Sequence, residues 1–211
     1  MLKPVALLLL LASPALARQV NVSSVSQLQP ALASAQAGDE IILADGTYAV
    51  NTNLSCTANG TAQAPIVVRA QNRLGASIRF NAVEGFKVSG AYWTFDGLDI
   101  QGVCADDNNC EHAFHVTGRA GHFVLRNSRV RDFNAQLKVN ASQNGGTWEI
   151  PHRGLIERNE LSDTRPRATS KPVTKLNIDT GDHWIIRDNL IHDFHKNGGD
   201  FVSGGPLAGG G

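Results

Sequence analysis

A motif that recurs about every 30 residues constrains this chain more than any other feature. Each copy reads as a short apolar run, a polar turn and a second apolar run, with no helical pattern between copies. The four copies start, at offsets of 30, 31 and 30 residues, at Trp93, Phe123, Gly154 and Trp184. A tight hairpin cannot join parallel strands, so the chain must coil, each turn stacking on the one before. The repeat therefore predicts an all-β fold, a single-stranded parallel β-helix.

Polar residues recur at one position of the turn inside this motif. Ser128, Asn159 and Asn189 all fall there. Asparagine tolerates the left-handed backbone conformation and bonds to nearby backbone groups, so it suits a stacked turn. We expect these three side chains to form a ladder of hydrogen bonds from rung to rung.

A second set of columns precedes each repeat. In each copy, two apolar residues two positions apart are expected to face inward; these pairs start at Phe86, Phe114, Leu137 and Leu176. The residue between the two members of a pair, and the residue after the pair, then face outward, and both are polar. We call these outward residues the polar strip; they are Lys87, His115, Lys138 and Asn177, followed by Ser89, Thr117, Asn140 and Asp179. We expect the polar strip to run across one sheet, with Lys175 beside it.

Two segments near the N-terminus differ from the repeats. Residues 24–37 predict a helix, with Ser24 or Ser26 as its cap, Leu28 and Leu32 on one face and Gly38 at its end. Such a helix would cap one open end of the stacked sheets. Residues 1–17 combine a charged start, a short apolar run and a small-residue cleavage pattern, which predicts a signal peptide and a secreted or periplasmic protein. The apolar run is too short to span a bilayer, so no membrane span is expected.

Charge excludes one class of protein and hints at a ligand. The chain has 19 basic and 19 acidic residues, whereas a general nucleic-acid binder would be strongly basic. Residues 118–175 hold 11 basic and 5 acidic residues, a net charge of +6. We expect either an anion-binding region there or an arginine-rich solvated surface.

Three cysteines in an exported protein predict one disulfide. Cys104 and Cys110 flank a short polar loop, and we expect them to pair, leaving Cys56 over. All three pairings are compatible with the sequence alone.

The N-terminal residues carry a resemblance to a known family. The segments Leu28-Gln29-x-Ala31-Leu32 and Gly38-Asp39-x-Ile41-x-Leu43-x-Asp45-Gly46-Thr47-Tyr48 resemble the start of polysaccharide lyase family 6, the chondroitinase B-like and alginate lyase group. The resemblance implies a right-handed β-helix over residues 18–211 that cleaves uronate-containing polysaccharide by β-elimination. It also implies a Ca²⁺ ion that neutralises the uronate carboxylate and a lysine base.

The chain departs from that family at the site, because the Glu-x-Glu pattern followed by Lys is absent. By column, we expect Lys138, Lys175 and His115 as catalytic residues and Asn140 and Asp179 as ligands of Ca²⁺. Lys87, Asn177 and Trp148 are the expected substrate-binding residues. His112 and His115 are three apart on a strand, so we expect them on opposite faces and exclude a zinc site.

Residues 204–211 are too rich in glycine to complete a rung, so we expect a β-helix that is incomplete at the C-terminus. The first hypothesis is a monomeric enzyme or enzyme fragment acting on anionic polysaccharide. The alternative is a non-catalytic carbohydrate-binding or surface β-helix protein.

Overall fold

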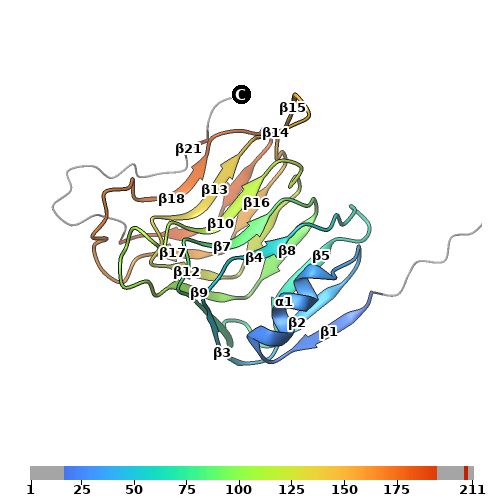
Figure 1. Cartoon of the computed structure of the whole chain (residues 1–211), viewed down its shortest axis with the longest axis horizontal. Helices are drawn as coiled ribbons and strands as arrows, with labels where there is room; N and C mark the ends of the chain where they lie inside the picture. The colour runs from blue at the N-terminus through green and yellow to red at the C-terminus, as the bar shows by residue number, and fades with distance from the viewer. Residues whose placement is uncertain (1–16, 194–206, 209–211) are drawn as a thin grey trace, which may run out of the picture.

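A computed structural model describes residues 17–193 and 207–208. In this part of the chain, strands coil through three stacked parallel sheets, and successive strands go round the sheets in turn. Figure 1 shows the rungs following one another from the blue N-terminal end to the red C-terminal end. The predicted parallel β-helix is confirmed. The proposed signal peptide lies outside the described residues, as does most of the glycine-rich end.

The three sheets are built from the strands in chain order. Sheet 1 contains β1 (Gln19–Val22), β2 (Glu40–Leu43), β5 (Ile66–Ala70), β8 (Trp93–Asp96), β11 (Val124–Arg126), β16 (Leu155–Glu157) and β19 (Ile185–Arg187). Sheet 2 contains β3 (Gly46–Val50), β6 (Ala76–Phe80), β9 (Asp99–Gly102), β12 (Arg129–Arg131), β17 (Glu160–Ser162) and β20 (Leu190–Ile191). Sheet 3 contains β4 (Leu54–Cys56), β7 (Glu84–Val88), β10 (His112–Thr117), β13 (Ala135–Asn140), β18 (Thr174–Ile178) and β21 (Leu207–Ala208). An antiparallel hairpin, β14 (Ser142–Asn144) and β15 (Thr147–Glu149), projects after β13.

The core follows from the predicted columns. The register pairs Phe86 with Phe114, Phe114 with Leu137, and Leu137 with Leu176. All four side chains are fully buried, and the rings of Phe86 and Phe114 stack with their centroids 5.2 Å apart. Each rung thus covers the apolar residues of the next, which is why the fold needs many copies of the repeat.

The turn ladder is present as well. The Oδ1 atom of Asn159 accepts from the backbone N–H of Ser128 at 3.0 Å, and Asn189 Oδ1 accepts from the N–H of Asn159 at 3.0 Å. In the turns that carry the ladder, the residue with the left-handed backbone conformation is the one directly before the ladder residue, as at Asn127 and Arg158. The ladder residues therefore supply side-chain bonds, while their neighbours make the turn.

The helix α1 (Val25–Ala33) covers the N-terminal end of the coil (Figure 1). Leu28 and Leu32 are buried against the core, as predicted. Ser24 holds the N-cap position without a side-chain cap bond. The helix ends earlier than predicted: Ser34 is its C-cap with φ −101° and ψ 9°, and the next N–H, that of Ala35, donates to Leu32 three residues back rather than four. The Ser34 hydroxyl also donates to the Pro30 carbonyl.

The cysteines fall into two states. Cys104 and Cys110 form a disulfide with their Cα atoms 5.7 Å apart. Cys56 is free and buried, and burial raises the pKa of its thiol.

Candidate functional site

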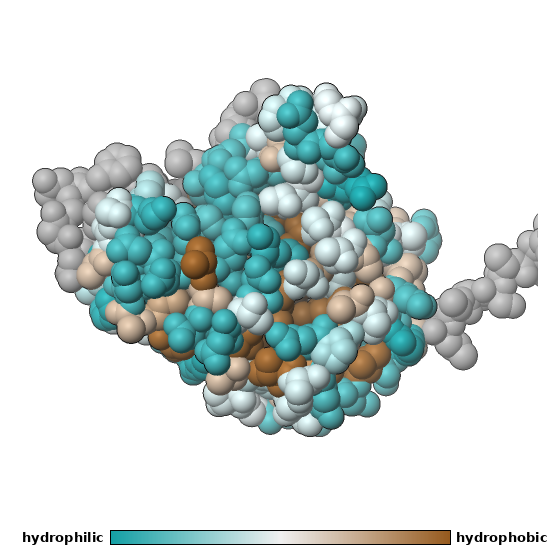
Figure 2. Space-filling view, viewed as in Figure 1, coloured by the Kyte–Doolittle hydropathy of each residue, from teal (hydrophilic) through white to brown (hydrophobic). Residues whose placement is uncertain are grey.

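The polar strip lies on the outer face of sheet 3. The register aligns Lys87 with His115, His115 with Lys138, and Lys138 with Asn177, so the predicted column is confirmed. Figure 2 shows hydrophilic surface over β10, β13 and β18, whereas most hydrophobic patches lie toward the end that carries α1. The later rungs of sheet 3 therefore present the largest polar surface in this view.

Near the start of the sheet 3 strands, one extra residue points inward and breaks the alternation of inward and outward side chains. We call this position the corner; in β10 it is Ala113. In β10, Ala113 and Phe114 are both fully buried, while His112 and His115 on either side are partly exposed. Two consecutive inward residues bring positions i and i+3 to the same face, and the two imidazole centroids lie 5.4 Å apart. The expectation that His112 and His115 lie on opposite faces is wrong, because it assumed strict alternation through the corner.

One end of the polar strip is a hydrogen-bonded cluster around Asp179. The Lys138 ammonium donates to the Asp179 carboxylate. Asn140 Nδ2 also donates to Asp179, at 3.2 Å. With its amide oriented to suit its neighbours, Asn177 donates to Asp179 and accepts from Lys138 Nζ at 3.1 Å. Lys138 and Asp179 thus form an ion pair at this end of the polar strip.

The other end of the polar strip centres on Glu84. His115 Nδ1 lies 2.5 Å from Glu84 Oε1, and Lys87 Nζ lies 2.9 Å from Glu84 Oε2. The other ring nitrogen of His115 lies 3.1 Å from Asn140 Oδ1, which joins the two ends. Burial opposes ionisation of Glu84, but its bonds with Lys87 and His115 hold its pKa below the usual value.

Lys175 does not lie on the polar strip. It occupies the inward corner position of β18, is 1% exposed, and places Nζ 2.5 Å from the buried Asp163 carboxylate. Burial lowers the pKa of Lys175 and raises that of Asp163. The expected position of Lys175 beside Lys138 is therefore wrong: a residue of the corner points into the coil.

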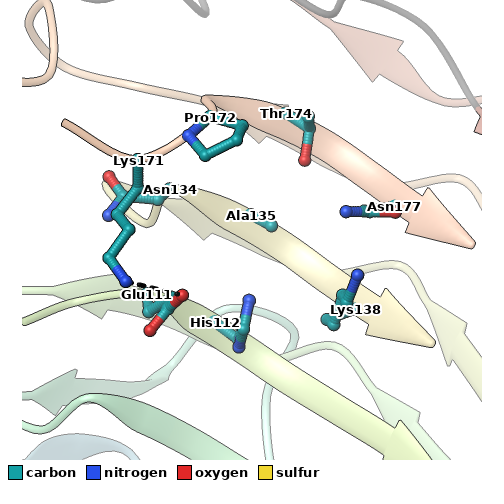
Figure 3. Close-up of a pocket in the computed structure, with 9 residues that line it drawn as sticks. All are labelled: Glu111, His112, Asn134, Ala135, Lys138, Lys171, Pro172, Thr174 and Asn177. Atoms are coloured by element: carbon teal, nitrogen blue, oxygen red, sulfur yellow. Dashed lines mark ion pairs between the residues drawn. The ribbon is translucent and has the colours of Figure 1, made fainter. Parts of the chain in front are cut away.

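A hollow of about 190 Å³ opens beside the polar strip. Figure 3 shows its lining residues, which come from β10, β13, β18 and the residues just before each of these strands: Glu111, His112, Asn134, Ala135, Lys138, Lys171, Pro172, Thr174 and Asn177. Burial lowers the pKa of His112, so its imidazole is neutral near pH 7. Sequence reasoning missed His112 as a site residue, although its spacing from His115 was visible.

Trp148 lies apart from this hollow, on β15 of the projecting hairpin. Its side chain is 63% exposed, which leaves an aromatic face open to solvent. The hairpin is tied back by Arg119, whose Nε lies 3.5 Å from Glu149 Oε1.

The excess positive charge of residues 118–175 is largely paired rather than gathered on the polar strip. Arg126 pairs with Asp96, Arg129 and Arg131 pair with Asp99, and Arg165 and Arg167 pair with Asp107, all carboxylates from the acidic segment before it. The field that a net charge of +6 implied for the polar strip is therefore mostly neutralised. The polar strip therefore presents individual charged groups rather than a broad basic patch.

The residues at Asn140 and Asp179 do not fit a calcium ion. Calcium takes six to eight oxygen ligands, and several are usually carboxylates. Among the residues that the structure describes, Asp179 is the one carboxylate that bonds to Asn140, and it is already paired with Lys138. The Asn140 oxygen faces His115.

The fold and site together define a right-handed β-helix protein with a polar strip on one sheet. The sequence matches the family described as "Pel9A-like, right handed beta helix region" over residues 13–148, more than half of the chain. The chain belongs to this family, and the right-handed form of the β-helix is confirmed. No curated protein matches the sequence significantly.

Solved structures share the fold. "A new PL6 alginate lyase complex with trisaccharide" is similar at 23% identity and a TM-score of 0.54, over 87% of this chain and 37% of that one. The PL6 family alginate lyase AlyGC is similar at 19% identity and a TM-score of 0.51, over 85% of this chain and 30% of that one. The chain thus spans about a third of the length of these two structures. The expected resemblance to the lyase family is confirmed for the fold.

Proposed function

We propose that this protein binds uronate-containing polysaccharide along the polar strip, with one sugar carboxylate at the hollow beside Lys138. The observation that carries the proposal is the lining of that hollow. The Lys138 ammonium has a third N–H beyond those it gives to Asp179 and Asn177, and the Asn177 amide has a second N–H beyond the one it gives to Asp179. Both residues line the hollow on a polar surface. A charge-assisted hydrogen bond from an ammonium is a strong way to hold a carboxylate.

Two further features support this ligand class. The fold is shared with structures that are named as alginate lyases, one of them in complex with a trisaccharide. The exposed face of Trp148 is suited to stack against a sugar ring. Lys87, also exposed, extends the polar strip by one more ammonium.

The described residues favour binding over cleavage. A base for β-elimination must be unprotonated and within reach of the proton it removes. Lys138 instead donates to Asp179, Lys175 is buried against Asp163, and both ring nitrogens of His115 face oxygen atoms. That a form of the protein with an unprotonated base cleaves the polysaccharide stays a prediction.

The proposal has two further parts: the protein is exported after its signal peptide, residues 1–17, is removed, and it acts as a monomer.

The direct test is binding to alginate and polygalacturonate, with neutral dextran as the control polymer. We expect binding to the two uronate polymers alone, weakened as salt rises because exposed charges are screened. Lys138→Met should weaken it, whereas Arg187→Met should not, since Arg187 pairs with Glu157 on sheet 1.

Equal binding to dextran, or equal loss in the two variants, would refute the proposed site. The same samples are assayed for the absorbance of unsaturated uronate. Strong turnover that Lys138→Met abolishes would show a lyase rather than a binding protein.

A further inference from the structure

The cluster of Glu84, His112 and His115 on the outer face of β7 and β10 has the composition of a transition-metal site. One ligand atom from each residue lies within 4.8 Å of the others. Two imidazole nitrogens with one carboxylate oxygen is a set that binds zinc and similar divalent ions, whereas calcium prefers oxygen ligands alone. The fold brings the three together because the corner puts His112 and His115 on one face and the register pairs His112 with Glu84.

The hydrogen bonds around His115 decide which ring nitrogen is free to bind. Asp179 can only accept, so Asn140 turns its Nδ2 toward Asp179 and its Oδ1 toward His115. His115 Nε2 must then carry the proton that it donates to Asn140. An outer partner that fixes the tautomer in this way is typical of histidines that bind metals.

The same logic leaves His115 Nδ1 in need of a positive partner. With the proton on Nε2, a neutral ring presents the Nδ1 lone pair to Glu84 Oε1 at 2.5 Å. Two lone pairs are not stable at that distance unless a proton or a metal ion lies between them. The Nδ1 atom of His112 is buried, has no hydrogen-bond partner among the described residues, and lies 3.7 Å from the same Glu84 oxygen.

We propose that Glu84, His112 and His115 bind one divalent metal ion of the zinc class, through Glu84 Oε1 and the Nδ1 atoms of both histidines. Tetrahedral zinc with bonds of about 2.0–2.1 Å places neighbouring ligand atoms about 3.3 Å apart. The two separations from Glu84 Oε1, 2.5 Å to His115 and 3.7 Å to His112, lie on either side of that value, and all three ligand atoms lie within 4.8 Å of one another, so side-chain rotations must bring them together around the ion. Three protein ligands leave a position open to a fourth, and His112 also lines the hollow, so the ion would lie at the edge of the hollow.

The neighbouring charges sharpen the test. Lys87 holds the second oxygen of Glu84 at 2.9 Å, and its ammonium opposes a cation at Oε1. Removing that charge should strengthen metal binding rather than weaken it. A purely structural cluster would respond to Lys87→Met only by losing an ion pair.

The experiment measures zinc bound per chain by equilibrium dialysis of chelator-treated protein, with the visible spectrum of bound Co²⁺ as a second readout. We expect one zinc per chain, unaffected by excess Ca²⁺. Glu84→Gln and His115→Gln should each lose more affinity than the about 10–100-fold expected for Asn140→Ala, an outer partner. Lys87→Met should bind more tightly.

The matched control is His183→Gln, which alters an exposed histidine paired with Asp182 on another part of the surface. It should leave zinc binding unchanged. Less than one zinc per chain, or the same affinity in Glu84→Gln, His115→Gln and the unaltered protein, would overturn the proposal. Glu84 and His115 lie at the surface, so their variants keep the test valid even if His112→Gln fails to fold. The outcome does not depend on whether the protein binds polysaccharide.

Discussion

The early and late rungs of sheet 3 use one corner position in opposite ways. Gly85 and Ala113 fill it in β7 and β10, whereas Gln136 and Lys175 fill it in β13 and β18. At Gly85 an added Cβ would lie 2.5 Å from the Ala113 carbonyl oxygen, so the corner of β7 has no room for a side chain and that of β10 holds only the methyl group of Ala113. The late corner accommodates long polar side chains, and it does so only because buried partners meet them.

Those partners come from the end of β17 and from the residue that follows it. Gln136 Nε2 donates to the Ser162 carbonyl at 3.1 Å, and Lys175 donates to Asp163 at 2.5 Å. Beside them Arg167, almost fully buried, pairs with Asp107 at 2.9 Å. The comparison shows that the same backbone coil is held by apolar packing at one end and by buried ion pairs at the other.

The largest effect is expected from Lys175→Ala. Removing one partner of a buried ion pair leaves the Asp163 charge without compensation and costs about 3–5 kcal/mol of unfolding free energy. Urea unfolding measures it, with Lys171→Ala as the exposed control, expected to change stability by less than about 1 kcal/mol. Similar losses in both variants would show that the late corner is no different from the surface.

Asp107→Asn should rank next. Asp107 accepts from Arg165 and from the Ala168 N–H, and it pairs with Arg167, so the amide leaves a buried guanidinium poorly compensated, at about 3 kcal/mol. Burial opposes ionisation of Asp107, but these partners hold its pKa below the usual value. The unfolded chain therefore takes up the proton first, and this part of the stability is present at neutral pH and lost as pH falls below about 5.

Unfolding measured from pH 7 to pH 3 checks the sign. The unaltered protein should lose stability toward acid, and Asp107→Asn should lose less over the same range. A variant that is destabilised equally at every pH would show that the Asp107 charge is not what ties this segment down.

The sequence predicted the coil well because its columns repeat. The inward pairs that begin at Phe86 and Phe114 needed only the 30-residue period and the alternation of a strand. The alternation does not hold at the corner, so the prediction put Lys175 on the outer face and put His112 and His115 on opposite faces, both wrongly. No local pattern marks the corner, since it arises where the coil bends between two sheets.

The hydrogen-bond and ion-pair partners of the site residues could not be predicted from the sequence either. Glu84 meets His115 across 31 positions, and Asp179 meets Lys138 across 41. Such contacts depend on the register between rungs rather than on spacing along the chain. The positive charge of residues 118–175 predicted an anion-binding region for the same reason. Its arginines in fact pair with carboxylates one rung away.

Gln136→Ala tests the corner with a smaller change, since it installs the residue that β10 has at this position. The variant removes two bonds of Gln136 Nε2, to the Ser162 carbonyl and to Asp163 Oδ1, while the Ser162 carbonyl keeps its bond from the Asp132 N–H. Losing two such hydrogen bonds costs about 1–3 kcal/mol. Ala113→Ser is the matched change in the early corner. It should also lower the unfolding free energy, because the fully buried site offers the new hydroxyl little room. A Gln136→Ala variant as stable as the unaltered protein would mean that the late corner tolerates an apolar filling after all.

Lys138→Met should have the smallest effect on folding and the clearest effect on the proposed function. Lys138 is ion-paired like Lys175, but its partner Asp179 is 43% exposed, so water compensates the carboxylate when the ammonium is removed. Exposed ion pairs contribute less than about 1 kcal/mol, and the unfolding free energy should change by no more than that. Uronate polymer binding should nevertheless fall, because the hollow loses its ammonium. A large loss of stability in Lys138→Met, with binding retained, would place Lys138 with the structural ion pairs of the interior and remove it from the polar strip as a ligand contact.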